Sequence, residues 1–162
     1  MPLAVVQSDA PTTHHIGQLT IGQSDIELGF QVSVCRTGRV GEPMSVQDRT
    51  WAGLMRRIGL VHLRIWQWEV LADRVDLLLS ELVTNGFQHG QGETVDVRLW
   101  RTGGHVGIEV ASGGGPQVPC PRVPGLFDES GRGLGLVAAV ADAWGIADGG
   151  RIWCLVARGE ST

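Results

Sequence analysis

"LLLSELVTNGFQHG", residues 77–90, decides the fold, because it has the pattern of a helix that carries both core residues and a line of polar groups. Its apolar residues recur at helical spacing and predict a helix from about residue 70 to residue 87, which glycines 90 and 92 end. Glu81, Asn85 and His89 follow one another at intervals of four. Side chains at that spacing lie nearly in line, so the three polar groups share one face and the leucines point elsewhere.

This polar line has two interpretations. The amide oxygen of Asn85 is a ligand that suits Mg²⁺, which takes only one or two protein oxygens. The carboxylate of Glu81, one turn away, is placed to orient or deprotonate a hydroxyl group or a water. The other interpretation is a solvent-facing polar stripe with hydrogen bonds between successive turns. The spacing of Glu81 and Asn85, taken alone, favours the second.

A second motif, "SGRGLGL" at residues 130–136, places three glycines before and inside the start of a helix: Gly131, Gly133 and Gly135. Such a turn presents free backbone N–H groups and the positive end of the helix dipole to an anion. Arg132 lies between two of the glycines and is placed to reach a phosphate. A flexible loop with a helix cap explains the motif equally well. A Walker loop is excluded because the chain contains no lysine, and a dinucleotide fingerprint is excluded because Leu136 stands where a glycine is required.

The pattern along the chain predicts one α+β domain. The expected elements are a strand at 26–35, a helix that Ser45 begins, the helix at 70–87, a hairpin at 94–112, a helix at 131–145 and a strand at 149–157. We therefore expect a two-layer sandwich, with a mixed, mainly antiparallel sheet covered by helices on one face. Residues 1–24 lack any period and predict a mobile tail, which leaves a domain at 25–160. The stretch at 59–68 stays open, as does the choice between core and partner surface for Trp66 and Trp68.

Composition narrows the function classes. The net charge of −4 argues against direct contact with nucleic acid, which favours a basic surface. The longest apolar stretch is shorter than a membrane-spanning helix, and no leader segment is visible. Three widely spaced cysteines are typical of reduced thiols, so we expect a cytoplasmic protein without a disulfide or zinc site.

The two motifs, taken together with the hairpin and the proline- and glycine-rich loop between them, resemble the ATP-binding domain shared by gyrase, heat-shock chaperone ATPases, histidine kinases and mismatch-repair ATPases. "LLLSELVTNGFQHG" and "GRGLGLVAAVADAWG" are most similar to the small stand-alone proteins related to anti-sigma-factor serine kinases. The resemblance covers about residues 28–157.

The resemblance implies ATP and Mg²⁺ as cofactors, and it implies roles for particular residues. Asn85 would be the Mg²⁺ ligand, Glu81 the general base, and His89 a contact to the phosphates or ribose. Residues 113–130 would form a lid over the nucleotide. The remaining cofactor-binding positions that it implies are Ser112 and Gly114 near the base, and Gly131, Arg132, Gly133, Leu134 and Gly135 around the triphosphate.

Two departures from the family pattern fall on the adenine side. The family places an aspartate that accepts the adenine amino hydrogen where this chain has Ser112, or Ala111 if the register slips by one. A threonine on the last strand is replaced by Ile152. A serine hydroxyl accepts a hydrogen bond, but it lacks the charge that roughly doubles the strength of such a bond. Both departures are expected to weaken base recognition and to leave the phosphate side intact.

Two function hypotheses follow. In the first, the protein is an ATP- and Mg²⁺-binding transcription regulator that binds a sigma factor, or a serine/threonine kinase that phosphorylates the antagonist protein of an anti-sigma factor. In the second, it is a non-catalytic protein-interaction module with weak or lost ATP binding. Either form is compatible with a homodimer. The sequence does not name the protein partner.

Overall fold

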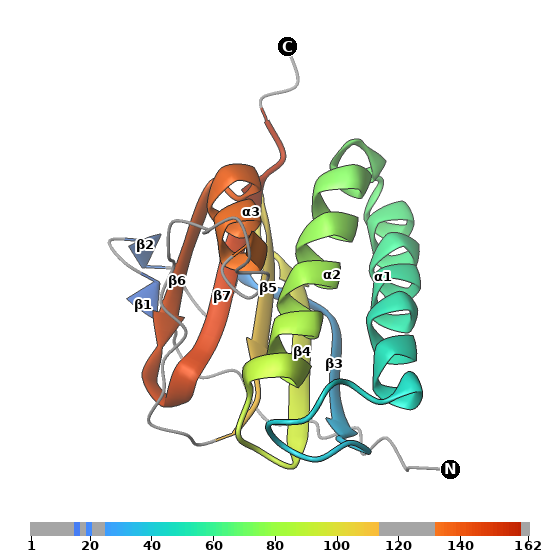
Figure 1. The fold of residues 1–162 in the computed structure, drawn as a ribbon. Helices are drawn as coiled ribbons and strands as arrows, with labels where there is room; N and C mark the ends of the chain where they lie inside the picture. The colour runs from blue at the N-terminus through green and yellow to red at the C-terminus, as the bar shows by residue number, and fades with distance from the viewer. Residues whose placement is uncertain (1–14, 17–18, 21–24, 114–131, 160–162) are drawn as a thin grey trace.

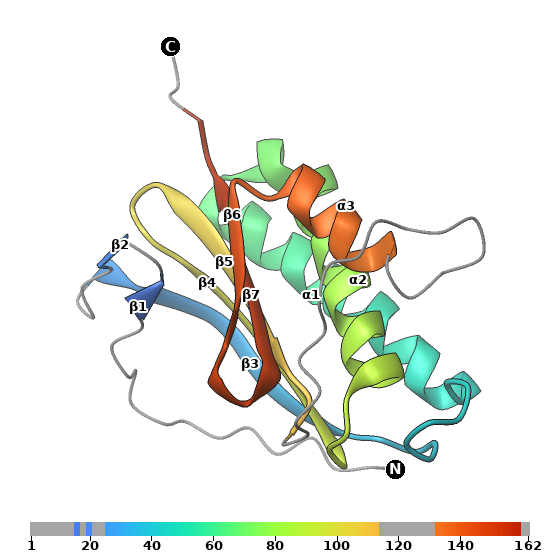
Figure 2. The same cartoon turned by 60° about the vertical axis from the view of Figure 1, so that its left-hand side comes forward.

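The computed structural model describes residues 15–16, 19–20, 25–113 and 132–159. A five-stranded sheet runs in the order β3-β4-β5-β7-β6, and three helices cover one of its faces (Figure 1, Figure 2). The strands are β3 (Glu27–Cys35), β4 (Thr94–Arg101), β5 (His105–Ala111), β6 (Ala143–Ala147) and β7 (Arg151–Ala157). The helices are α1 (Val46–Trp66), α2 (Ala72–His89) and α3 (Arg132–Val140), with short 3-10 turns η2 (Glu69–Leu71) and η3 (Asp148–Gly150). This is the α+β sandwich that the sequence predicts.

The sheet and the helices share one hydrophobic core. In β4 and β5 every second residue points toward the helices, so that Val97 and Ile108 are almost fully buried. On the other side of the core, α2 contributes the leucines that set its helical period, among them Leu78 and Leu82. Every pairing in the five-stranded sheet is antiparallel, which refines the expectation of a mixed sheet.

Helix α1 continues through Gly59 and ends at Trp66, so it covers most of the stretch at 59–68 that the sequence left open. Ser45 caps its N-terminus, since the hydroxyl oxygen accepts a hydrogen bond from the backbone N–H of Asp48 at 3.0 Å. Gly59 does not end the helix. A Cβ built there would lie 2.5 Å from Cδ1 of Leu79 on α2, so this glycine lets the two helices pack closely. Trp66 and Trp68 are only 6% and 4% exposed, which places both in the core.

The helix predicted at 131–145 is wrong at its C-terminal end. Helix α3 ends at Val140, and the chain continues as β6 on the edge of the sheet. Asp142 causes the change of direction, because its N–H donates to Leu155 at 2.9 Å and its carboxylate accepts from the N–H of Ala157 at 2.6 Å. The same carboxylate accepts from Arg74 of α2 at 2.8 Å, so the end of α3 is tied both to β7 and to α2.

Some predictions concern residues beyond the described ranges. Of the expected tail at 1–24, only β1 (His15–Ile16) and β2 (Leu19–Thr20) are described, and they form a small antiparallel pair. The expected lid at 113–130 lies outside the described residues except for Gly113. Cys35 and Cys154 are free thiols, the second of them buried, while Cys120 falls in the same undescribed stretch. No helix among the described residues is both long and apolar enough to cross a membrane.

Candidate functional site

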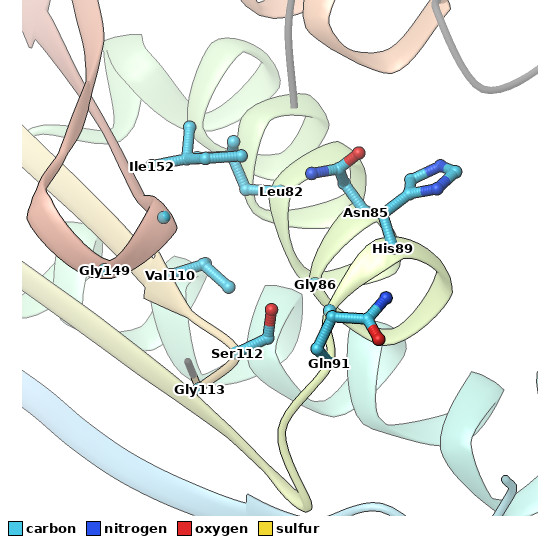
Figure 3. Close-up of a pocket in the computed structure, with 12 residues that line it drawn as sticks. Leu82, Asn85, Gly86, His89, Gln91, Val110, Ser112, Gly113, Gly149 and Ile152 are labelled. Atoms are coloured by element: carbon cyan, nitrogen blue, oxygen red, sulfur yellow. The ribbon is translucent and has the colours of Figure 1, made fainter. Parts of the chain in front are cut away.

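A pocket that is partly open to solvent lies between the C-terminal half of α2 and the neighbouring ends of β5 and β7 (Figure 3). Its apolar side chains are Leu82, Val110 and Ile152. Its polar side chains are Asn85, His89, Gln91 and Ser112, and its remaining lining is made of glycines 86, 90, 113, 149 and 150.

Glycines bring the helix and the sheet together at this point. A Cβ on Gly86 would lie 2.9 Å from Cγ1 of Val110, and a Cβ on Gly90 would lie 2.0 Å from Oγ of Ser112. Any side chain at either position would therefore push α2 away from β5. The N–H of Gly92 donates to the carbonyl of Ser112 at 2.9 Å, which holds the end of β5 against the chain that leaves α2.

The amide of Asn85 is the best candidate for a ligand contact. Asn85 is only 7% exposed, and its side chain lines the pocket without a hydrogen bond to another described residue. Its amide group is not one of the fully buried unpaired groups, so it faces the pocket, where its oxygen and nitrogen are available to a ligand, a cation or water. Figure 3 shows His89 beside it on the same helix, as the spacing of four predicts.

Glu81 lies one turn earlier on α2 and is half-buried. Burial raises the pKa of its carboxyl group above the ordinary value. Glu81 does not line the pocket itself, so the structure brings Asn85, His89 and Ser112 together and leaves Glu81 beside them.

The glycine-rich motif is described only in part. Arg132 and Gly133 form the first turn of α3. Leu134 is 2% exposed and belongs to the hydrophobic core, while Gly135 does not line the pocket. Gly114 and Gly131 lie outside the described residues. The roles that the resemblance implies for these residues stay predictions.

Arg36 holds the helix end that forms the pocket, although no sequence pattern pointed to this residue. Its guanidinium group donates hydrogen bonds to four backbone carbonyls at the C-terminus of α2 and just beyond it: Gly86 at 3.3 Å, Phe87, Gly90 at 3.1 Å and Gly92 at 3.1 Å. The cation also lies over the Phe87 ring, 5.8 Å from its centroid. The last carbonyls of a helix have no partners within the helix, and a cation near them is favourable. Arg36 is therefore committed to the wall of the pocket rather than to a ligand.

A buried carboxylate fixes the backbone that follows Arg36. Asp48 accepts hydrogen bonds from the N–H and hydroxyl of Thr37, at 3.0 and 2.7 Å, and from the N–H of Gly38 at 3.0 Å. Burial alone would raise the pKa of Asp48, but these hydrogen bonds, with that of Ser45, outweigh it and hold the pKa below its ordinary value. The segment after β3 is thereby anchored to the start of α1.

The lining of the pocket has an apolar part and a polar part. Leu82, Val110 and Ile152 supply the apolar part of the lining, and the Ser112 hydroxyl lies beside them. No cluster of three or more histidine, cysteine or acidic side chains is found in the described ranges. A cation here would rely on the Asn85 oxygen together with phosphate oxygens and water, which is the ligand set that Mg²⁺ prefers.

Comparison with known proteins identifies the family of the chain. The family model described as histidine kinase-like ATPase domain matches residues 48–156. An uncharacterised Streptomyces coelicolor protein, SCO4941, is 38% identical over 81 residues, an alignment that covers 44% of this chain and 71% of that protein. The range that the family model matches extends from α1 to β7 and includes every residue that lines the pocket. The chain belongs to the histidine kinase-like ATPase domain family, which supports ATP binding.

Proposed function

We propose that this member of the histidine kinase-like ATPase domain family binds ATP with Mg²⁺ in the pocket between α2 and the β5–β7 ends, and acts as a regulator of the anti-sigma-factor kinase type. One observation carries the proposal. Asn85, His89 and Ser112, for which the resemblance implies nucleotide contacts, line a single pocket although Ser112 follows β5 and the other two lie on α2.

In this proposal different pocket residues contact different parts of the nucleotide. Leu82, Val110 and Ile152 pack against the faces of the base, and the Ser112 hydroxyl meets its polar edge. The Asn85 amide oxygen ligates Mg²⁺, which when bound neutralises charge on the phosphates. The N–H groups at the start of α3 receive phosphate oxygens, as helix N-termini do.

The raised pKa of Glu81 supports a catalytic role for it. A carboxylate works best as a general base when its pKa lies close to the working pH, and burial moves Glu81 in that direction. We propose that it accepts the proton of a serine hydroxyl on a protein partner as that oxygen attacks the γ-phosphorus and ADP leaves. The partner would be the antagonist of an anti-sigma factor, and a sigma factor would be the second binding partner.

Two observations favour a non-catalytic alternative. Ser112 presents no carboxylate to the base, and Ile152 presents no hydroxyl. In the alternative, the fold binds its protein partner by contact alone, with ATP bound weakly or not at all.

Calorimetry with Mg-ATP tests the binding proposal. We expect a measurable heat of binding for the wild type at up to millimolar nucleotide. Asn85→Ala should lose at least tenfold in affinity, since it removes the proposed cation ligand. Gln88→Ala is the matched control, because Gln88 is an exposed amide on the same helix and should leave affinity unchanged. A folded wild type that gives no heat, or equal loss in both variants, would contradict the proposal.

A labelling experiment separates the kinase from the non-catalytic alternative. Extract from the native cells is incubated with γ-labelled ATP and either wild type or Glu81→Gln. The kinase proposal predicts a labelled protein that appears with the wild type and not with Glu81→Gln, although both variants bind ATP. Equal labelling with the two variants, or none with either while ATP still binds, supports the alternative.

A further inference from the structure

Ser112 sets the polarity of the apolar end of the pocket. It lies two residues beyond Val110 on β5, so both side chains face α2, and Val110 pairs with Ile152 of β7. Figure 3 shows the Ser112 hydroxyl pointing into the space beside Val110 and Gly86. The hydroxyl has no hydrogen-bond partner among the described residues, and none of the described lining residues is an aspartate or a glutamate. The edge of a ring bound against Val110 and Ile152 therefore meets a neutral hydroxyl group.

A hydroxyl and a carboxylate select different ring edges. An ionised carboxylate only accepts hydrogen bonds, so it pairs with a 6-amino group and repels a 6-oxo group. A serine hydroxyl donates one hydrogen bond, accepts two and rotates freely. It can accept from the amino group of adenine, and it can equally donate to the oxo group of hypoxanthine or guanine.

The close packing around Ser112 fixes where the hydroxyl sits. A Cβ on Gly90 would lie 2.0 Å from its Oγ and 2.3 Å from its Cβ, so the serine is seated directly against the C-terminus of α2. The carbonyl of Ser112 is held by the N–H of Gly92 at 2.9 Å. The hydroxyl therefore lies against the C-terminus of α2, within the lining of the pocket.

We propose that Ser112 is a specificity-determining residue that makes the pocket tolerant of 6-oxopurine nucleotides, so that ITP and GTP bind about as well as ATP. The inference rests on the proposed nucleotide site and deepens it. It concerns the class of purine that is bound and not whether nucleotide is bound.

The ratio of ATP to ITP affinity, measured by calorimetry with Mg²⁺, tests the proposal. These nucleotides differ only at the 6-position and the adjoining ring nitrogen, so the 2-amino group of guanine does not complicate the comparison. We expect the two dissociation constants of the wild type to agree within about threefold, less than the worth of one neutral hydrogen bond at its upper end. GTP then reports whether the pocket also has room for the 2-amino group.

Ser112→Asp and Ser112→Asn, whose side chains have the same shape as each other, test whether hydrogen-bonding character at this position sets the ATP-to-ITP ratio. Ser112→Asp introduces an acceptor-only carboxylate and should favour ATP over ITP by at least tenfold. Ser112→Asn has the same shape but offers both a donor and an acceptor, so its ratio should stay near that of the wild type. Ser112→Ala, which adds no atoms, should weaken both nucleotides by about three- to tenfold without changing their ratio. If melting curves show that Ser112→Asp or Ser112→Asn does not fold, Ser112→Ala still tests whether the hydroxyl contacts the nucleotide.

The outcomes separate this inference from the binding proposal. A wild type that binds ATP and rejects ITP by more than tenfold overturns the inference and leaves the nucleotide site standing. Unchanged affinity for both nucleotides in Ser112→Ala also overturns it, because the hydroxyl is then not the contact. Failure of every nucleotide to bind the folded wild type removes the proposed function and the inference with it.

Discussion

Replacing Arg36 should damage both the stability and the ligand site of this protein. Its guanidinium donates to carbonyls that span the last turn of α2 and the chain just beyond it, and two of these residues, Gly86 and Gly90, line the pocket. Arg36→Ala would leave those carbonyls without their charged donor and would remove the cation from the negative end of the helix dipole.

The magnitude follows from the contacts. A hydrogen bond to a charged group contributes about 1.5–3 kcal/mol, and several bonds made by one side chain do not add in full. Favourable placement at a helix C-terminus contributes up to about 2 kcal/mol, and the contact with the Phe87 ring about 0.5–1 kcal/mol. Because water can donate hydrogen bonds to some of the carbonyls that lose Arg36, we expect Arg36→Ala to lower the free energy of unfolding by about 3–5 kcal/mol. For a domain of this size the melting temperature should fall by roughly 6–20 °C.

Thermal and urea unfolding measure this loss, and two further variants sharpen it. Arg36→Lys keeps the charge but lacks the planar fork, so it should recover less than half of the lost free energy. Arg57→Ala removes an exposed arginine of α1 and should stay within about 0.5 kcal/mol of the wild type. Mg-ATP affinity should fall with Arg36→Ala under conditions in which the variant is still folded. A free energy of unfolding for Arg36→Ala within about 1 kcal/mol of the wild-type value would refute this role for Arg36.

Three further variants test other contacts. Asp48→Ala strands the N–H groups that its buried carboxylate binds and should cost about 2–4 kcal/mol in urea unfolding; wild-type stability would show that this turn does not anchor α1. Glu81→Gln removes a carboxylate whose pKa burial raises, so Glu81 contributes stability below its ordinary pKa that is lost as pH rises through the raised one. Its melting temperature should therefore exceed that of the wild type near about pH 8 and match it near about pH 4; an equal difference at both pH values would contradict this. Gly90→Ala places a Cβ 2.4 Å from a backbone carbonyl oxygen, so it should lower the free energy of unfolding by at least about 1–3 kcal/mol and weaken nucleotide binding. Gly53→Ala is the control: a Cβ there has no neighbour within 4 Å, so the variant should be as stable as the wild type or slightly more stable.

Local patterns predicted those parts of the fold whose cause is local. The period of the residues in α2, the alternation in the β4–β5 hairpin and the Ser45 cap each follow from side chains a few positions apart, and each is confirmed. The edge strand β6 was missed because its small and apolar residues continue the pattern of α3. What ends α3 is the set of contacts that Asp142 makes with β7 and with Arg74, and these join residues far apart in the chain.

The pocket shows the same division. Asn85, His89 and Ser112 were predicted from motifs and meet in one pocket, although their roles stay predictions. Gly149 and Gly150 were not predicted, because the turn that carries them joins β7 to the missed strand. Arg36 was not predicted either, because its partners lie 50–56 residues further along the chain and a strand-terminal arginine has no signature of its own.

The position of the nucleotide is the central claim, and the crystal structure of the protein with Mg²⁺ and a non-hydrolysable ATP analogue tests it most directly. We expect the base to lie between α2 and the ends of β5 and β7, with its 6-position at the Ser112 hydroxyl and the Asn85 oxygen on the metal ion. A nucleotide bound elsewhere on the chain, or a base that touches neither Val110 nor Ser112, would contradict it.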